Sequence, residues 1–223
     1  MHHCPLSLSP PLKTALVVPL PSGSYDVIEM AIAPKRAPAT IEDALARPES
    51  ERVELIRATI VPKAAPTGEH SGAQVHFDRR LGDRFDRRPG GRRPGGWWIR
   101  TEIDIQLGIE LFRPDLAGWR RDQCPEPPRG RPIRQRPDWI CEILSPSNEN
   151  VDRVDKMQSY FQASVPHYWL ADPIEQVLEV YRRTELAYAL VLSAKSGQTV
   201  RAEPFDAVEL RIDELFGADP EDD

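Results

Sequence analysis

The amino-acid sequence predicts an α/β or α+β domain with a central mixed β-sheet flanked by helices. Apolar residues recur every three or four positions in two stretches, 70–85 and 151–164, as on the buried face of a helix. Short apolar or alternating runs, typical of strands, lie before, between and after them. The order is helix, hairpin, helix, strands, helix, strands, which favours helices packed on one sheet.

Length and composition bound the class of protein. At 223 residues the chain is long enough for one domain with a sizeable core, and two full domains are not expected. No apolar stretch approaches the roughly 20 residues of a membrane span, so we expect no membrane partner. Three cysteines (Cys4, Cys124 and Cys141) at unrelated spacings favour a reducing, cytoplasmic location over a disulfide framework.

Composition also divides the chain into three segments. Residues 1–29 are rich in proline and predict a disordered extension, with the hypothesis that the natural start is Met30. Residues 30–217 predict a single folded domain. Residues 218–223 predict an acidic tail.

The first elements follow from local signals. Thr40 and the acids after it predict a capped helix at 40–46. Residues 53–61 alternate in two pieces around Arg57-Ala58, which predicts a hairpin. One amphipathic helix is then predicted from the spacing of His70, Ala73, Phe77, Leu81 and Phe85.

The second half of the chain is predicted to be mostly strands. Residues 97–107 and 111–119 each predict a strand, and the two are expected to form a hairpin. Loops rich in arginine and proline precede and follow this pair. Further predicted elements are a buried strand at 139–144, a helix at 151–164, and strands at 167–171, 176–182, 187–192 and 199–202.

Glu142 gives the strongest indication of function. It is the lone carboxylate in the apolar run 139–144, and an ionised carboxylate is costly to bury unless it is paired or binds a metal. Asp115 has a similar setting upstream, and Lys156 falls on a predicted helix. Carboxylates from neighbouring strands suit Mg²⁺, which leaves room for phosphate oxygens. With a lysine, this constellation hydrolyses phosphodiesters.

These residues also have ordinary explanations. A lone carboxylate on a strand is as often structural as functional, and an aspartate after a proline is usually a turn residue. Helical geometry places Lys156 beside the stripe formed by Val154, Met157 and Phe161, where a solvent-facing lysine is favoured. The case for Asp115 therefore depends on its pairing with Glu142.

Charge gives no global attraction to nucleic acid, because the net charge is −6. Binding would need metal ions or a local basic patch, and eight arginines between residues 79 and 100 could neutralise phosphates. A solvated loop is the favoured interpretation of these arginines. The adjacent Trp97 and Trp98 are expected to pack rather than to stack on bases.

Four motifs, in order, resemble a known family: Arg113–Ala117, Pro137–Ser147, Asp152–Tyr160 and Val165–Pro173. From about Thr40 to Phe216 the chain resembles the Uma-two family, described as restriction endonucleases, within the PD-(D/E)XK nuclease superfamily. The resemblance implies a restriction-endonuclease-like fold. It also implies an endonuclease that depends on Mg²⁺ or Mn²⁺ and hydrolyses phosphodiester bonds of DNA.

Carried over residue by residue, the resemblance assigns a metal site and a lysine. Asp115 and Glu142 become the metal ligands. Lys156 becomes the catalytic lysine, displaced onto the helix, because Leu144 stands where the superfamily usually has its lysine.

Two more residues gain a role from the resemblance. Glu54 matches an early E-L-I motif and adds a carboxylate, and His70 matches a histidine at the start of the next helix. The chain departs from the family at Arg57-Ala58, where a glycine is usual. A positive φ there would cost alanine about 1 kcal/mol.

Other functions stay open at this point. A non-catalytic module that keeps the nuclease fold would bind nucleic acid or protein without turnover. An enzyme on the same scaffold could act on RNA or branched nucleic acid instead of DNA. A homodimer is expected only by analogy with nucleases that pair to cut both strands.

Overall fold

The computed structural model describes residues 15–19, 25–29, 37–146 and 148–219. The chain divides into two compact units, Met1–Pro38 and Ala39–Asp223. In the first unit, strand β1 (Ala15–Pro19) pairs antiparallel with β2 (Tyr25–Glu29). The predicted boundaries at residues 29/30 and 217/218 stay predictions, and residues 30–36 and 220–223 lie outside the described part.

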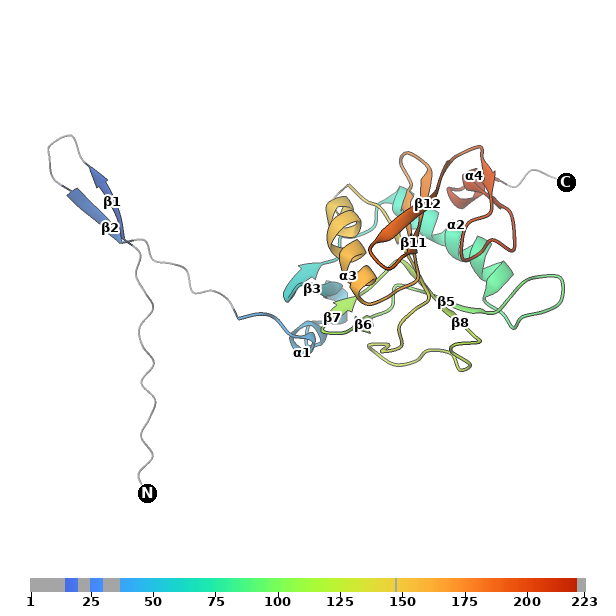
Figure 1. Ribbon diagram of the computed structural model, residues 1–223, viewed down its shortest axis with the longest axis horizontal. Coiled ribbons are helices and arrows are strands. Elements are labelled where there is room, and N and C mark those ends of the chain that lie inside the picture. The colour runs from blue at the N-terminus through green and yellow to red at the C-terminus, as the bar shows by residue number, and fades with distance from the viewer. Residues whose placement is uncertain (1–14, 20–24, 30–36, 147, 220–223) are drawn as a thin grey trace, which may run out of the picture. The chain divides into compact units, whose positions relative to one another are not determined.

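A six-stranded mixed sheet forms the centre of the second unit, as predicted (Figure 1). Only β9 and β10 run parallel, and every other neighbouring pair is antiparallel. The strands in spatial order are β12 (Tyr188–Lys195), β11 (Val177–Arg183), β10 (His167–Asp172), β9 (Trp139–Ile143), β8 (Leu116–Arg120) and β5 (Trp97–Thr101).

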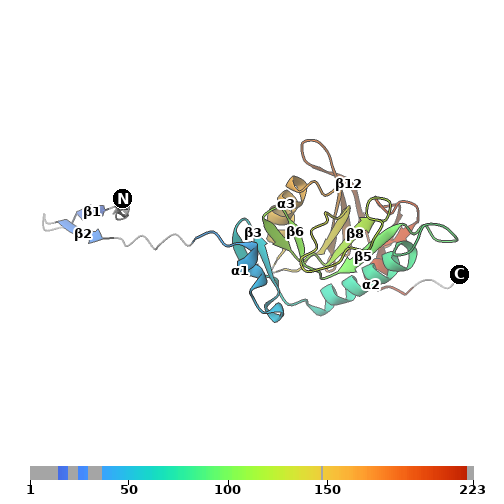
Figure 2. The same ribbon diagram turned by 90° about the horizontal axis from the view of Figure 1, so that it is seen from below.

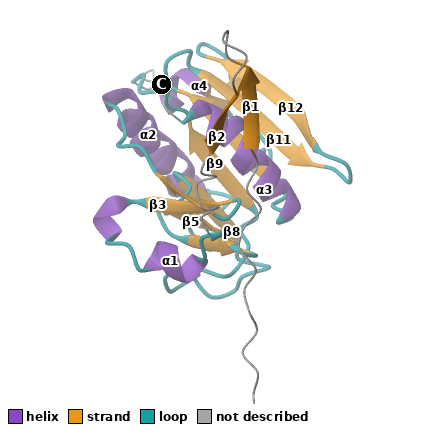
Figure 3. Cartoon of the chain, turned by 90° about the vertical axis from the view of Figure 1, so that its left-hand side faces the viewer, coloured by secondary structure: helices purple, strands orange, loops and turns teal. Residues whose placement is uncertain are grey.

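Helices cover the two faces of this sheet, and alternation along β9 divides its side chains between them (Figures 2 and 3). Helix α2 (Gly68–Phe85) packs on one face, in a core that includes Trp139, Cys141 and Ile143. Helix α3 (Met157–Gln162) packs on the other, with Ile140 and Leu144. Glu142 shares the parity of Ile140, so its side chain faces α3 rather than α2.

The predicted periodicity of α2 is confirmed. The buried residues of this helix are the five that defined its apolar face in the sequence: His70, Ala73, Phe77, Leu81 and Phe85. The Thr67 side chain caps its N-terminus by accepting a hydrogen bond from His70 N. A histidine is thereby held at the start of the helix and faces the sheet.

The predicted hairpin of residues 97–119 is divided between two sheets. Its outer halves, β5 and β8, join the six-stranded sheet, whereas its inner halves, β6 (Ile105–Leu107) and β7 (Glu110–Phe112), join a four-stranded sheet. The strands bend at Glu102, which has φ 52°, and at Arg113–Asp115. Continuous strands were therefore a wrong prediction, and the bend carries Asp115 to the junction of the two sheets.

The four-stranded sheet has the order β4-β3-β7-β6 and is covered by helix α1 (Ile41–Leu45). Strands β3 (Val53–Ile56) and β4 (Thr59–Pro62) form the predicted hairpin. Its turn residues, Arg57 and Ala58, have φ of 49° and 57°, the left-handed values of a type I′ turn. The strain expected for alanine at this turn is therefore present.

The chain ends in short elements packed against α2 and β12. These are β13 (Thr199–Val200), β14 (Leu210–Arg211) and α4 (Ile212–Leu215), and a 3₁₀ turn at Glu49–Glu51 precedes β3. Among the described residues, no helix combines the length and apolar character needed to cross a bilayer.

Candidate active site

Asp115 and Glu142 lie side by side at one end of the central sheet. Strands β8 and β9 are antiparallel neighbours, with Leu116 opposite Cys141. Asp115 immediately precedes β8, and Glu142 is the penultimate residue of β9, so the next step of this register brings the two together. Each is only 1% exposed. The adjacency of the two strands agrees with the sequence-based expectation.

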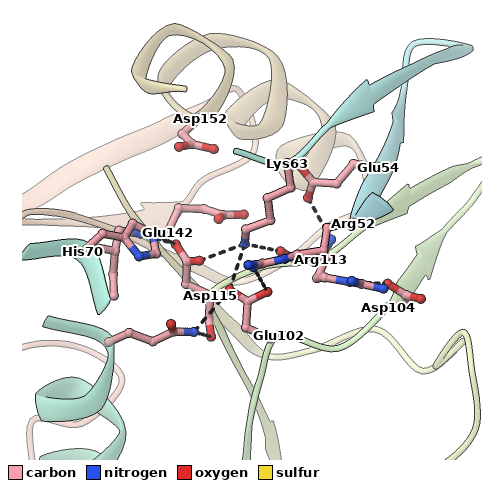
Figure 4. A network of polar contacts seen from close by, with 12 residues as sticks. Arg52, Glu54, Lys63, His70, Glu102, Asp104, Arg113, Asp115, Glu142 and Asp152 are labelled. Atoms are coloured by element: carbon pink, nitrogen blue, oxygen red, sulfur yellow. Dashed lines mark hydrogen bonds and ion pairs between the residues drawn. The ribbon is translucent and has the colours of Figure 1, made fainter. Parts of the chain in front are cut away.

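Three donors surround the Asp115 carboxylate (Figure 4). Lys63 Nζ lies 2.8 Å from Oδ1. Ile143 N donates to Oδ2 at 2.7 Å, and His70 Nε2 lies 3.2 Å from the same oxygen. Burial raises the pKa of Asp115, but the charge of Lys63 and the contact with His70 outweigh burial and hold the pKa well below its usual range. Asp115 is therefore ionised at neutral pH.

Glu142 belongs to a second cluster, centred on Lys156. Lys156 Nζ lies 3.1 Å from Glu142 Oε1, 3.0 Å from Glu54 Oε2 and 3.1 Å from Asp152 Oδ1. Tyr160 OH donates to the same Glu142 oxygen at 2.7 Å. Burial is the largest influence on Glu142, and one ammonium shared among three carboxylates does not offset it, so its pKa rises to about 8.

The solvent-facing alternative for Lys156 is wrong, since this residue is 1% exposed. The segment Val151–Lys156 forms a π-helix, η2, before α3 begins, and its wider turn changes the face that points inward. Asp152 and Lys156 are buried, whereas Val154, predicted to lie on the apolar stripe, is 59% exposed. Tyr160 is fully buried, as expected for a core residue, and also bonds to Glu142.

Glu54 and His70 both reach this end of the sheet. Glu54, on β3, accepts a hydrogen bond from Arg113 N at 2.7 Å through Oε1 and pairs with Lys156 through Oε2. His70 contacts Asp115, and its Nδ1 is buried without a hydrogen-bond partner among the described residues. All five residues singled out from the sequence thus meet at one place: Glu54, His70, Asp115, Glu142 and Lys156.

Two further site residues, Lys63 and Asp152, were not selected from the sequence. Lys63 directly follows β4, is 8% exposed, and also donates to Arg113 O. Lys63 is the one charged residue in the apolar stretch 60–66, and this signal, like the one around Glu142, was available in the sequence. Asp152 was visible within the Asp152–Tyr160 motif, and its spacing of four from Lys156 on a helix was the available signal.

A small cavity lies between the two clusters. It has a volume of about 10 Å³, close to that of one water molecule. The segment from Lys63 to Pro66 forms one wall, and the carboxylates Asp115, Glu142 and Asp152 form another. A phosphodiester is far larger than this space, so the site is closed in this conformation.

The donor set fits a hard divalent cation. Four carboxylates (Glu54, Asp115, Glu142 and Asp152) face two ammonium groups, which leaves two negative charges when all are ionised. Asp152 Oδ1 lies 3.1 Å from Lys156 Nζ and is buried without an aligned hydrogen-bond donor among the described residues. Oxygen ligands with unused lone pairs are those that Mg²⁺ and Mn²⁺ prefer.

The carboxylates are nevertheless held by lysines rather than gathered around a point. In the part of the chain that the structure describes, no three His, Cys, Asp or Glu side chains form a ready metal-binding group. Lys63 and Lys156 lie between them instead. Metal binding at this site would therefore require local rearrangement of at least one ammonium group.

The tryptophans next to the arginine loop pack, as expected. Trp97 is 6% exposed, and its ring lies 4.9 Å from that of Phe205. Trp98 carries the Arg121 guanidinium 3.4 Å from its ring centroid and donates to Cys124 O. Neither ring presents a free face for stacking on a base.

Comparison with known proteins agrees with this architecture. Residues 40–213 match the family Uma2, described as "putative restriction endonuclease". A crystal structure of a putative nuclease belonging to DUF820 from Anabaena variabilis ATCC 29413 superposes with a TM-score of 0.64. Sequence identity is 23%, over 80% of this chain and 98% of that chain, so the likeness shows the fold alone. No curated protein matches the sequence.

Proposed function

The chain belongs to the Uma2 family of putative restriction endonucleases, and from that premise we propose that it is a metal-dependent endonuclease that hydrolyses DNA phosphodiester bonds. The observation that carries this proposal is the meeting of Asp115 and Glu142 on adjacent strands, beside one small cavity. Two buried lysines next to them supply positive charge where a phosphate would be attacked. The predicted restriction-endonuclease-like fold is confirmed.

Asp115 and Glu142 are the proposed ligands of Mg²⁺ or Mn²⁺, with Asp152 as a further oxygen donor on the same cavity. When bound, such an ion lowers the pKa of a coordinated water and neutralises charge on the phosphate. The chain itself supplies the orientation of the ligands. Ile143 N and His70 fix Asp115, while Tyr160 fixes Glu142.

The lysines have separate proposed roles. All three N–H donors of Lys156 have carboxylate oxygens at 3.0–3.1 Å, so its first task is to orient Glu142 and to place positive charge beside the cavity. Lys63 forms an ion pair with Asp115. It follows β4, and its proposed role is that of the lysine which the superfamily usually has at the position of Leu144. The segment 63–66 must move before a phosphodiester can enter.

The test is cleavage of DNA by the purified full chain with Mg²⁺ or Mn²⁺. Wild-type protein is expected to nick supercoiled plasmid, and Asp115→Asn and Glu142→Gln are each expected to lose at least a hundredfold in rate, a rough figure for removal of a metal ligand. Glu209→Gln, an exposed carboxylate far from β8 and β9 in the sequence, serves as the control. Equal inactivity of all four proteins on every substrate would overturn the proposal.

A second candidate is a non-catalytic module on the same fold. It is favoured by the closed cavity and by the pairing of its carboxylates with lysines. It predicts binding of nucleic acid or protein without turnover. It also predicts that the wild-type protein has no Mn²⁺ site that depends on Asp115. Calorimetry with Mn²⁺ alone separates the two candidates, and a panel of duplex DNA, RNA and branched DNA identifies the substrate class.

A homodimer and a cytoplasmic location belong to the same proposal. The first rests on analogy with nucleases that cut both strands. The second rests on the odd number of cysteines, of which Cys124 and Cys141 are buried free thiols. Light scattering in solution checks the first, and cell fractionation checks the second.

A further inference from the structure

A larger hollow lies at the opposite end of β8 from the carboxylate cavity. It has a volume of about 590 Å³, within the range of ligand-binding sites. Strand β8 begins after Asp115 and ends at Arg120, so the two sites are separated by the length of that strand. Three arginines line the hollow, from the α2–β5 loop and the end of β8: Arg88, Arg120 and Arg121.

Arg121 is structural. Its Nε donates to Trp97 O at 2.7 Å, its Nη2 pairs with Asp86 at 3.2 Å, and its guanidinium lies on Trp98. The charge of its guanidinium group is paired with Asp86, and one face of the group packs on Trp98, so Arg121 forms part of the wall of the hollow. A ligand has to be recognised by other residues.

Arg88 and Arg120 are available to a ligand. Arg88 is exposed, and no described residue pairs with its guanidinium. Arg120 pairs with Asp122 at 3.2 Å, but both side chains are more than half exposed, and such pairs contribute little. Arg87 and Arg92, on the same loop, are also exposed and without ion-pair partners among the described residues. The positive charges of these arginines are therefore not neutralised by buried ion pairs within the described part of the chain.

The acidic residues of the hollow limit what can bind. Asp122 and Glu126 also line it and are exposed. They disfavour a phosphate next to their carboxylates, and Asp122, 3.2 Å from Arg120, has to release this arginine before a phosphate can pair with it. A chain of phosphates passing over the arginine side matches this distribution better than an anion enclosed in the centre.

We propose that this hollow binds the sugar-phosphate backbone of the nucleic acid whose scissile bond lies at the carboxylate cavity. The inference rests on the proposed nuclease function and adds a contact surface to it. The five steps from Asp115 to Arg120 span roughly 17 Å at about 3.3 Å per residue. B-DNA rises about 3.4 Å per nucleotide along its axis, so for a duplex lying parallel to β8 the contacted phosphate is roughly five nucleotides from the cut.

Binding of a 20-base-pair duplex, measured in EDTA by fluorescence anisotropy at several salt concentrations, tests the inference. The variant Arg88→Ala/Arg120→Ala is expected to bind roughly tenfold more weakly than wild type near physiological salt. The slope of log affinity against log salt is expected to flatten by about two, because two phosphate contacts are lost. Arg88→Lys/Arg120→Lys is expected to recover most of both effects.

The matched control is Arg47→Ala/Arg201→Ala. Each of these arginines is partly exposed and paired with a glutamate, as Arg120 is with Asp122, so the control removes the same net charge elsewhere. Equal affinities of the hollow variant and the control variant would overturn the inference. Circular dichroism is expected to show both variants folded, since every substituted side chain lies at the surface.

The outcome is distinguishable from that of the proposed function. A protein that cuts DNA but binds it equally well with and without Arg88 and Arg120 overturns the role of the hollow alone. A protein that never cuts, but loses binding only when these arginines are removed, overturns the nuclease proposal and supports the hollow as a nucleic-acid site.

Discussion

Asp115 and Glu142 are equally buried and lie next to each other, yet their pKa values move in opposite directions. Burial raises both. Asp115 is contacted by Lys63, by a backbone amide and by a histidine, and its pKa falls well below its usual range, although Lys63 also lies 3.6 Å from Glu102. Glu142 shares Lys156 with two other carboxylates, and its pKa is raised from 4.5 to about 8. The number of donors per carboxylate, rather than burial, decides the charge state.

This difference divides the tasks of the two residues. In the proposed metal site, Asp115 is already ionised at any pH near neutrality. Glu142 has to release a proton first, so its side of the cavity responds to pH and to metal. Pairs of titratable groups with pKa values pushed apart are a common feature of catalytic sites.

Of the substitutions considered, replacement of Lys156 should have the largest effect on the free energy of unfolding. Lys156→Met leaves three buried carboxylates around an apolar side chain, and we expect a loss of about 3–5 kcal/mol in the free energy of unfolding. Urea denaturation followed by tryptophan fluorescence measures it. Added Mn²⁺ should restore part of the loss in the variant, because a cation returns to the carboxylates. A loss below that of Lys195→Met, an exposed lysine, would contradict the central role of Lys156.

The raised pKa of Glu142 predicts the next largest effect. Between its usual value of 4.5 and about 8, the folded protein holds a proton that the unfolded chain has released. The metal-free protein should therefore lose stability as pH rises through this window. Mn²⁺ affinity should rise by about tenfold per pH unit below 8 and level off above it, because binding displaces the proton.

Glu142→Gln is the matched variant for this pH dependence. Its side chain has the same shape and does not titrate, so both the fall in stability and the gain in Mn²⁺ affinity between pH 5 and 8 should flatten. Calorimetric titrations at three pH values check this. An unchanged pH profile in Glu142→Gln would assign the proton to another group, such as Asp152, whose pKa is also raised by burial.

Replacing Lys63 should destabilise the protein less than replacing Lys156 does, and it should increase the affinity for Mn²⁺. Asp115 keeps its bonds from Ile143 and His70 in Lys63→Met, so we expect a loss of only about 1–3 kcal/mol. Mn²⁺ affinity should rise roughly tenfold, since a competing positive charge 2.8 Å from Oδ1 is gone. A fall in affinity would mean that Lys63 supports the ion instead of excluding it.

The turn of the β3–β4 hairpin should give the smallest effect. This hairpin supplies Glu54 to one cluster and Lys63 to the other. Ala58→Gly relieves the strain of φ 57°, worth about 1 kcal/mol, but loosens the unfolded chain by a similar amount, so a net gain within about 0.5 kcal/mol is expected. Ala58→Val should destabilise the protein by more than 1 kcal/mol, a rough lower figure, because β-branched residues resist positive φ.

Local patterns were enough to predict most elements and part of the site. The apolar run around Glu142 and the apolar periodicity of α2 are signals carried within single segments, and the structure agrees with both. The division of the 97–119 hairpin between two sheets could not be predicted in this way. The strands bend at Glu102 and Asp115, which are contacted by residues distant in the sequence: Arg52, just before β3, and Gln74 on α2.

The two lysines show why the rest was missed. Lys63 follows a four-residue strand in which no residue is fully buried, so its place in the apolar stretch 60–66 was the one local sign that it is covered. Lys156 was assigned to a face with a period of 3.6 residues, whereas η2 is a π-helix. Lys156 pairs there with three carboxylates, from β3, from β9 and from η2 itself, and two of these three partners lie outside its own segment.

The β3–β4 hairpin also has a consequence for biosynthesis. Lys63 meets Asp115 across 52 positions of the chain, and Glu54 meets a lysine that is synthesised later still. Closing such long loops costs entropy that only the assembled sheets repay. A nascent chain that has emerged through β8 holds Asp115 without Glu142 or Lys156, so the complete cluster can assemble only after the chain has been synthesised beyond Lys156.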